Sequence, residues 1–152
     1  MMKKTAVSRF VTKREINIFR GDVVLFHTFH SQKERKNYGD SSFIEIQFCK
    51  LSPDTPIKRI VAAESINHWQ NDSLYINDED TFFSEYRNIF SCGTYNNLES
   101  GTVDIYGINY YAPSLTSFLI EKLFRDKPTD YEVLIKWLNK AKAYHGFYIL
   151  GI

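Results

Sequence analysis

The C-terminal stretch TDYEVLIKWLNKAKAYHGFYILGI (residues 129–152) decides the fold, because it combines an amphipathic helix pattern with a short apolar strand. Thr129 and Glu132 have the spacing of a capping box, in which each side chain satisfies a free backbone N–H. Gly146 suits the left-handed position after a helix. We therefore expect a helix from about Thr129 to Tyr144, capped at Thr129. Its apolar face recurs at helical spacing and comprises Tyr131, Leu134, Ile135, Leu138 and Ala141.

The strand that follows this helix, FYILGI (147–152), is apolar throughout, and burial in a sheet would explain that composition. A second strand is expected at SFIEIQFC (42–49), where apolar residues alternate with Glu45 and Gln47 in the period of a half-buried strand. Similar but weaker patterns predict four more strands: INIF (16–19), DVVLFHTFH (22–30), SLYI (73–76) and TVDIYGINYY (102–111). The polar segment SQKERKNYGD (31–40) is expected to be a loop.

Two further helices are indicated upstream. PSLTSFLIEKLF (113–124) places Leu115, Phe118, Leu119 and Leu123 on one side. NDEDTFFSEYRNIF (77–90) carries an apolar stripe and begins with Asn77 or Asp78 as a possible cap. The sequence thus predicts an α+β fold, in which residues 1–152 form a single domain with a mainly antiparallel sheet and about three packed helices. The predicted core comprises Ile44, Ile46, Phe48, Phe118, Leu119, Leu134, Leu138 and Ile149.

Length and composition are those of one globular domain: the chain has 152 residues, of which 43% are hydrophobic and 24% charged. The two cysteines have neither metal-site spacing nor the numbers of a disulfide framework. No apolar stretch follows the basic N-terminal residues, and none approaches the length of a membrane span. We therefore expect a reduced, soluble, cytoplasmic protein without membrane contact.

Charge is unevenly distributed along the chain. Residues 1–60 carry twelve Lys/Arg against six Asp/Glu, residues 61–120 carry one against eight, and residues 121–152 carry six against four. Such asymmetry points to charged partners, unless folding interleaves the segments. The most acidic stretch is NDEDTFFSEY (77–86), whose four carboxylates exceed what helix capping requires. It lacks the ligand spacing and glycine of a calcium loop, so no metal site is expected there.

No motif for catalysis, cofactor binding or metal binding stands out. His27 and His30 are three apart on an expected strand and so point to opposite faces, which disfavours a shared metal. Cys49 and Cys92 are interpreted as structural thiols. The basic residues of 31–40 are diluted by acids, so direct nucleic-acid binding is not expected. A hydrolase-type enzyme with a non-local site, assembled from residues such as His27, Cys49 and His145, stays open as an alternative.

The tyrosine-rich strand YGINYY (106–111) has two interpretations. Tyrosine on an exposed sheet face is typical of protein interfaces. The alternative is core packing around a bulge at Gly107.

In its overall character the chain resembles the immunity proteins of bacterial contact-dependent growth inhibition and polymorphic toxin systems. The resemblance lies in one small domain rich in Tyr, Phe, Asn and Ile, with an acidic segment such as NDEDTFFSEY and no catalytic motif. It implies a cytoplasmic α+β protein that binds a cognate toxin domain, often a basic nuclease, and blocks its active site. A regulatory or scaffold module is the other non-enzymatic alternative. The residues expected to contact a partner are Asp78, Glu79, Asp80, Glu85, Tyr86, Tyr106, Tyr110 and Tyr111.

Overall fold

The apolar C-terminal strand lies in the middle of the sheet, as its composition predicts. In the computed structural model, which describes residues 23–38 and 43–151, β6 (Phe147–Leu150) pairs with β1 (Ile44–Phe48) on one side and β5 (Ile108–Tyr111) on the other. The full order is β2-β1-β6-β5-β3-β4, and every pairing is antiparallel. The remaining strands are β2 (Leu74–Ile76), β3 (Gly93–Tyr95) and β4 (Ser100–Gly101).

Alternation along the central strands divides the core between the two faces of the sheet. The side chains that point toward one face belong to the larger core cluster. They are Ile44, Ile46 and Phe48 of β1 and Phe147 and Ile149 of β6. The side chains that point toward the other face pack in a second cluster. They include Tyr148 and Leu150 of β6 and Tyr110 of β5.

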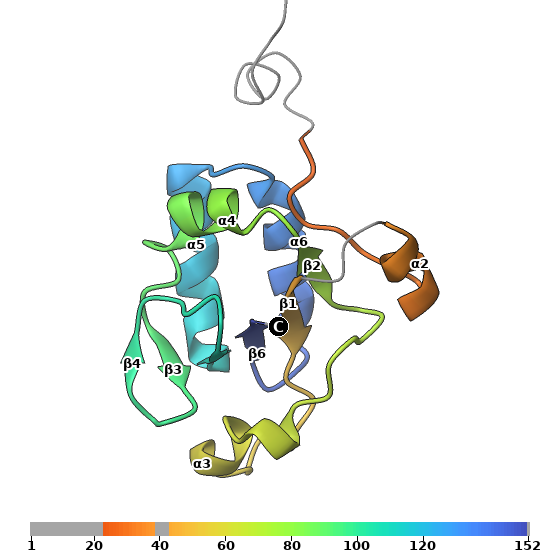
Figure 1. Ribbon diagram of the computed structural model, residues 1–152. Coiled ribbons are helices and arrows are strands. Elements are labelled where there is room, and N and C mark those ends of the chain that lie inside the picture. Colours follow the sequence, from red (N-terminus) through yellow and green to blue (C-terminus); the bar gives the residue numbers. More distant parts are fainter. Residues whose placement is uncertain (1–22, 39–42, 152) are drawn as a thin grey trace, which may run out of the picture.

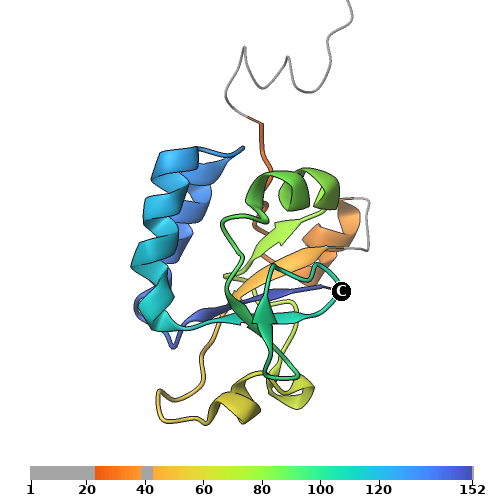
Figure 2. The ribbon, with the colours of Figure 1, turned by 90° about the vertical axis from the view of Figure 1, so that its left-hand side faces the viewer.

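Three helices cover the first face: α4 (Glu79–Tyr86), α5 (Thr116–Asp126) and α6 (Tyr131–Ala141). Figure 2 shows α5 and α6 side by side as one layer, and Figure 1 shows α4 at the level of their upper ends. The short turn η2 (Pro113–Leu115) leads into α5. The α+β prediction is therefore confirmed for residues 23–38 and 43–151, with three longer helices on an antiparallel sheet.

The second face is covered by shorter pieces: α2 (Gln32–Asn37), α3 (Ile57–Ile60), η1 (Ala63–Ser65) and the loop that follows η1. Ile60 and Val61 pack on Cys49, Tyr110 and Tyr148. Next to them Phe29, Phe43 and Tyr75 form a small third cluster, against which Trp69 packs. Because both faces are covered, the prediction that β1 is only half-buried is wrong: Glu45 and Gln47 are buried too.

Several expected segments differ from the structure. The expected loop at 31–40 contains α2, whose first turn is capped by the Ser31 hydroxyl accepting the Glu34 N–H at 3.1 Å. Among the described residues, the expected strand at 22–30 contributes one isolated bridge, between His27 and Tyr75. The strand at 102–111 is shortened to β5, because the Tyr106 N–H donates to the Asp104 carboxylate in a turn. The predicted strand at 16–19 lies outside the described residues, which leaves the domain's N-terminal extent a prediction.

The helix predicted at 129–144 is present as α6, but the predicted cap is wrong. Asp130, not Thr129, occupies the N-cap position, with a left-handed φ of 61° and no capping side-chain bond. Thr129 instead bonds Glu85 of α4: its N–H and its hydroxyl each lie 2.8 Å from Oε1. Gly146 is left-handed as expected, with φ of 80°. It lies beyond the helix, at the turn into β6.

The core prediction holds for seven of its eight residues, and Phe118 is the exception. Its side chain is 50% exposed, whereas its neighbour Leu119 is fully buried. α6 packs beside the face of α5 that carries Leu119 and Leu123, so Phe118 is left on the outer side.

Candidate functional site

Helix α4 positions the acidic residues that were expected to meet a partner. Asp78 is its N-cap, and the Asp78 carboxylate accepts the Thr81 N–H at 3.2 Å and the Thr81 hydroxyl at 2.8 Å. The apolar side of the helix is anchored in the core by Phe82 and Tyr86, which are fully buried. The first turn is therefore held at a defined place, with Glu79 and Asp80 directly after the cap.

We call the three carboxylates of α4, Glu79 and Asp80 in its first turn and Glu85 near its end, the acidic edge of this helix. Asp80 and Glu85 are exposed and Glu79 is partly exposed. Glu85 also joins α4 to the start of α6, through the bonds it accepts from Thr129. Within the described ranges, Glu79 and Asp80 take part in no side-chain hydrogen bond or ion pair. The helix thus presents carboxylates beyond those that hold it in place.

Three of the four tyrosines predicted to contact a partner are buried, and that part of the prediction is wrong. The Tyr86 hydroxyl donates to the Thr129 carbonyl at 2.6 Å, and the Tyr110 hydroxyl to the His145 carbonyl at 2.7 Å. Tyr111 stacks on Phe147 with ring centroids 5.0 Å apart. Burial raises the pKa of all three phenols, so they stay protonated. The cause is coverage of both sheet faces: Tyr110 and Tyr111 point to opposite sides, and each side is packed.

Tyr106 is the predicted contact tyrosine that does lie on the surface, and it is 76% exposed. It sits in the turn before β5, where the Asp104 carboxylate accepts the Tyr106 N–H at 2.9 Å. The Asp104 N–H in turn donates to Asn109 Oδ1 at 2.8 Å. The turn that carries Tyr106 is therefore fixed, although it is separate from α4.

The residues of the possible non-local enzyme site are not brought together. His27 forms a bridge with Tyr75 of β2, and Tyr75 in turn lies opposite Glu45 of β1. Cys49 lies four residues after Glu45, past the other end of β1. Four strand residues span about 13 Å. Cys49 is close to His145, whose N–H donates to the Cys49 carbonyl at 3.0 Å. However, the Cys49 thiol is fully buried and donates to the Tyr148 hydroxyl at 3.6 Å.

No metal centre is formed by the side chains of residues 23–38 and 43–151: they contain no group of three His, Cys, Asp or Glu that could hold an ion. In the same ranges no helix has the length and apolar character needed to cross a membrane.

A polar network on the second face was missed by sequence reasoning. The Glu45 carboxylate is completely buried and accepts four hydrogen bonds. Two come from backbone N–H groups, of Trp69 at 2.8 Å and Gln70 at 3.0 Å. The other two come from side chains, of Ser73 at 2.6 Å and Gln47 at 3.0 Å. The Tyr75 hydroxyl lies 3.3 Å from the carboxylate, but it donates its proton to the Gln70 carbonyl at 2.5 Å. These hydrogen bonds hold the loop at 67–73 against one buried carboxylate.

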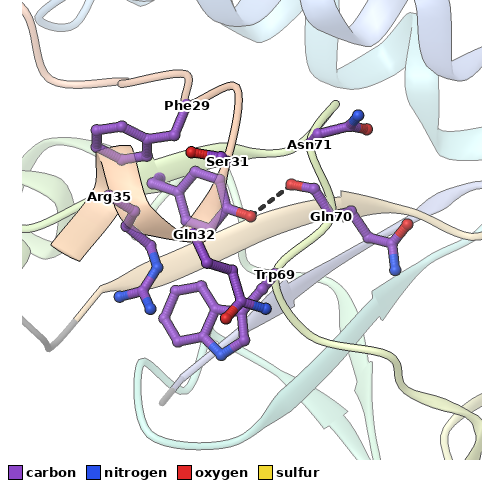
Figure 3. A pocket seen from close by; sticks show the side chains of 8 residues that line it. Phe29, Ser31, Gln32, Arg35, Trp69, Gln70 and Asn71 are labelled. Carbon is purple, nitrogen blue, oxygen red and sulfur yellow. Dashed lines mark hydrogen bonds between the residues drawn. The ribbon is translucent and has the colours of Figure 1, made fainter.

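A small pocket lies between this loop and α2. It is lined by Arg35, which, like Glu45, sequence reasoning did not identify as a site residue. Arg35 of α2 is buried, with 5% exposure, and its guanidinium carbon lies 3.5 Å from the centroid of the Trp69 ring. Figure 3 shows Arg35 and Trp69 together at one side of the pocket. The only sequence signal was a basic residue within a segment of mixed charge, which is typical of solvated helices.

No protein-family model matches the chain, and comparisons with curated proteins and with solved structures found no match either. A functional proposal therefore rests on the residues of this chain alone.

Proposed function

We propose that this protein is an immunity protein, which binds a cognate toxin domain with a basic active site and blocks that site. The observation that carries the proposal is the acidic edge of α4, where Asp80 and Glu85 are exposed and Glu79 is partly exposed. A nuclease site is basic because its substrate is a polyanion. Clustered carboxylates are attracted to such a site and speed the encounter with it.

The position of α4 supports this role, because the helix is held along its length. Asp78 caps its start, Glu85 binds Thr129, and Lys122 of α5 donates to the Asn88 carbonyl at 2.8 Å just past its end. A surface fixed in this way loses little conformational freedom when it binds. The acidic edge is therefore suited to present charge to a partner without rearrangement.

Tyr106 is the proposed aromatic contact. Exposed tyrosines in fixed positions are frequent among the residues that contribute most binding energy. We assign it a secondary role, because it lies on a turn separate from α4. The toxins blocked by such proteins act inside the cell, so the proposed location is the cytoplasm.

The test is protection from the toxin encoded beside this protein's own gene. The proposal requires the preceding gene to end in a toxin domain. That domain is expressed in a laboratory bacterium with and without this protein, and growth is measured. We expect growth to be restored by the unmodified chain and lost again with the double variant Glu79→Lys, Asp80→Lys.

A matched control carries the same charge change at two exposed acids outside α4, Glu64→Lys with Glu121→Lys. This variant should still protect. Failure of the unmodified chain to protect or to bind would refute the immunity function. Equal loss of protection in both double variants would show that net charge, and not the acidic edge, is what matters.

A further inference from the structure

We propose that the pocket between α2 and the loop at 67–73 is a binding site for a single carboxylate group, held by the guanidinium of Arg35. This proposal is independent of the immunity function, because none of the residues that line the pocket belongs to α4. The lining consists of Phe29, Ser31, Gln32, Arg35, Trp69, Gln70, Asn71 and Tyr75.

The first argument is the position of Arg35. Its side chain is 95% removed from solvent (5% exposed), and one face of the guanidinium is covered by the Trp69 ring at 3.5 Å. Trp69 is itself stacked on Tyr75, with ring centroids 5.7 Å apart and an interplanar angle of 14°. Stacking fixes the guanidinium plane, and it leaves the N–H groups along the plane's edge as donors.

The second argument is that the guanidinium lacks an acceptor for its hydrogen bonds. Within residues 23–38 and 43–151, Arg35 forms no ion pair, and its buried Nε has no hydrogen-bond partner. Glu45 lies on the same face of the sheet, but its carboxylate is occupied by the four donors described above. Trp69 stabilises the cation through one face only, and a buried Nε donor without an acceptor costs free energy that a bound acceptor would recover.

The third argument is the size and lining of the pocket. Its volume of about 30 Å³ exceeds what one water requires, so the pocket has room for a small polar group beside Arg35. The Gln32 side chain extends beside Arg35 and Trp69 as a further donor, whereas the amide of Asn71 points away from Arg35 (Figure 3). A guanidinium fork with a neighbouring amide is the arrangement that binds a carboxylate through two parallel hydrogen bonds. The carboxylate can belong to a small free acid or to an acidic residue of a partner protein.

The experiment follows the Trp69 indole N–H in ¹H–¹⁵N NMR spectra of the full chain during titration with sodium acetate. Acetamide serves as the neutral isostere, and sodium chloride matches the ionic strength. We expect a saturable shift of the Trp69 signal with acetate alone. Absence of that shift, or an equal shift with acetamide or chloride, would overturn the proposal.

Variants then test the role of Arg35. Arg35→Met should abolish the acetate response, and Arg35→Lys should weaken acetate affinity by about tenfold, because a lysine cannot form the two parallel bonds. If the methionine variant does not fold, the acetate affinity of Arg35→Lys alone tests the role of Arg35. The matched control is Arg87→Met, since Arg87 likewise lies over an aromatic ring, at 5.5 Å from that of Phe83, but is exposed. It should keep the full response. An unchanged acetate response in Arg35→Lys would refute the assignment.

A final comparison distinguishes the two sources of the carboxylate. The peptide N-acetyl-Gly-Glu-Gly-amide is titrated beside its Gln counterpart. Binding of the Glu peptide with at least the affinity of acetate indicates a protein-borne carboxylate, and binding of acetate alone indicates a small free acid. Either result supports the site, whereas equal binding of the Glu and Gln peptides contradicts it.

Discussion

At the scale of single residues, the hydroxyl of Thr129 joins two helices. It lies 2.8 Å and 2.9 Å from the two carboxylate oxygens of Glu85, on the last turn of α4. Thr129→Val removes these bonds and keeps the shape of the side chain. We expect the free energy of unfolding to fall by about 1 kcal/mol, as is typical of one hydrogen-bonded group.

A double-mutant cycle separates this role from helix capping. If the Thr129 hydroxyl acts through Glu85, the combined variant Thr129→Val, Glu85→Ala should be less destabilised than the sum of the single variants. Strict additivity would mean that Thr129 stabilises α6 by itself.

His27 gives the fold a dependence on pH. It is half-buried, and that burial lowers its pKa from about 6.5, while the nearby Asp130 carboxylate opposes the change. The neutral imidazole is therefore favoured in the folded state. Its contribution to stability is complete above about pH 6.5 and is lost as the pH falls toward the lowered value.

The expected result is a smaller loss of unfolding free energy between pH 7.5 and pH 5.5 in His27→Gln than in the unmodified protein. Asp130 acts in the opposite sense: burial raises its pKa, against the hydrogen bonds from Phe26 and Leu25, so its contribution falls as the pH rises from acid values. Chemical denaturation at the two pH values measures the difference. Identical losses would show that His27 does not couple to folding.

At the scale of elements, β1 depends on one buried carboxylate. Glu45→Gln places an amide NH₂ where a carboxylate oxygen accepts backbone N–H groups, since both oxygens are used. We expect a loss of about 1.5–3 kcal/mol in unfolding free energy. The amide protons of the loop at 67–73 should also exchange faster in hydrogen-exchange measurements. Glu64→Gln, at an exposed acid, should change stability by less than about 0.5 kcal/mol. Normal exchange in the loop of Glu45→Gln would contradict this role.

The helix pair α5–α6 offers a comparison of two apolar residues. Leu138 is fully buried and Phe118 is half exposed, with the ammonium of Lys122 5.2 Å from its ring centroid. Leu138→Ala should lower the free energy of unfolding by about 2–5 kcal/mol because it leaves a cavity. Phe118→Ala should lower it by less than about 1 kcal/mol. Denaturant titrations measure both, and comparable losses would show that the outer face of α5 is also packed.

How far the fold could be predicted depends on which elements interact. The periodicity of β1, β6, α5 and α6 is local, and it correctly predicted their types and most of the core. The burial of Glu45 depends on donors 24 to 28 residues away, so no local pattern could indicate it. Likewise Thr129 fits a capping box by spacing, but a residue 44 positions away takes its hydrogen bonds.

The candidate site was predictable only in part, for the same reason. Exposure of Asp80 and capping by Asp78 follow from helix geometry and were expected. Burial of Tyr110 and Tyr111 follows from the coverage of both sheet faces, and the short helices that cover the second face have weak sequence patterns. Arg35 could not be distinguished from solvated basic residues until the loop carrying Trp69 was placed beside it.

At the scale of the whole molecule, the charge asymmetry of the sequence is concentrated at α4. The segment 61–120 contains one basic residue against eight acids, and three of those acids form the acidic edge. Exposed charges at the rim of an interface act mainly on the association rate, and salt screens their effect. Asp78 and Glu85 also hold the structure together, so only Glu79 and Asp80 can be reversed without removing a structural bond.

The most direct test of the proposed function is an association rate constant, measured by stopped flow, for the toxin domain that the proposal expects beside this protein's gene. We predict that Glu79→Lys, Asp80→Lys lowers this constant by at least about tenfold at low ionic strength, and that the difference shrinks as salt is added. Thermal unfolding is recorded alongside, since two lysines oppose the helix dipole by about 0.3–1 kcal/mol each. A folded double variant with an unchanged, salt-independent association rate would contradict the claim that α4 is the docking surface.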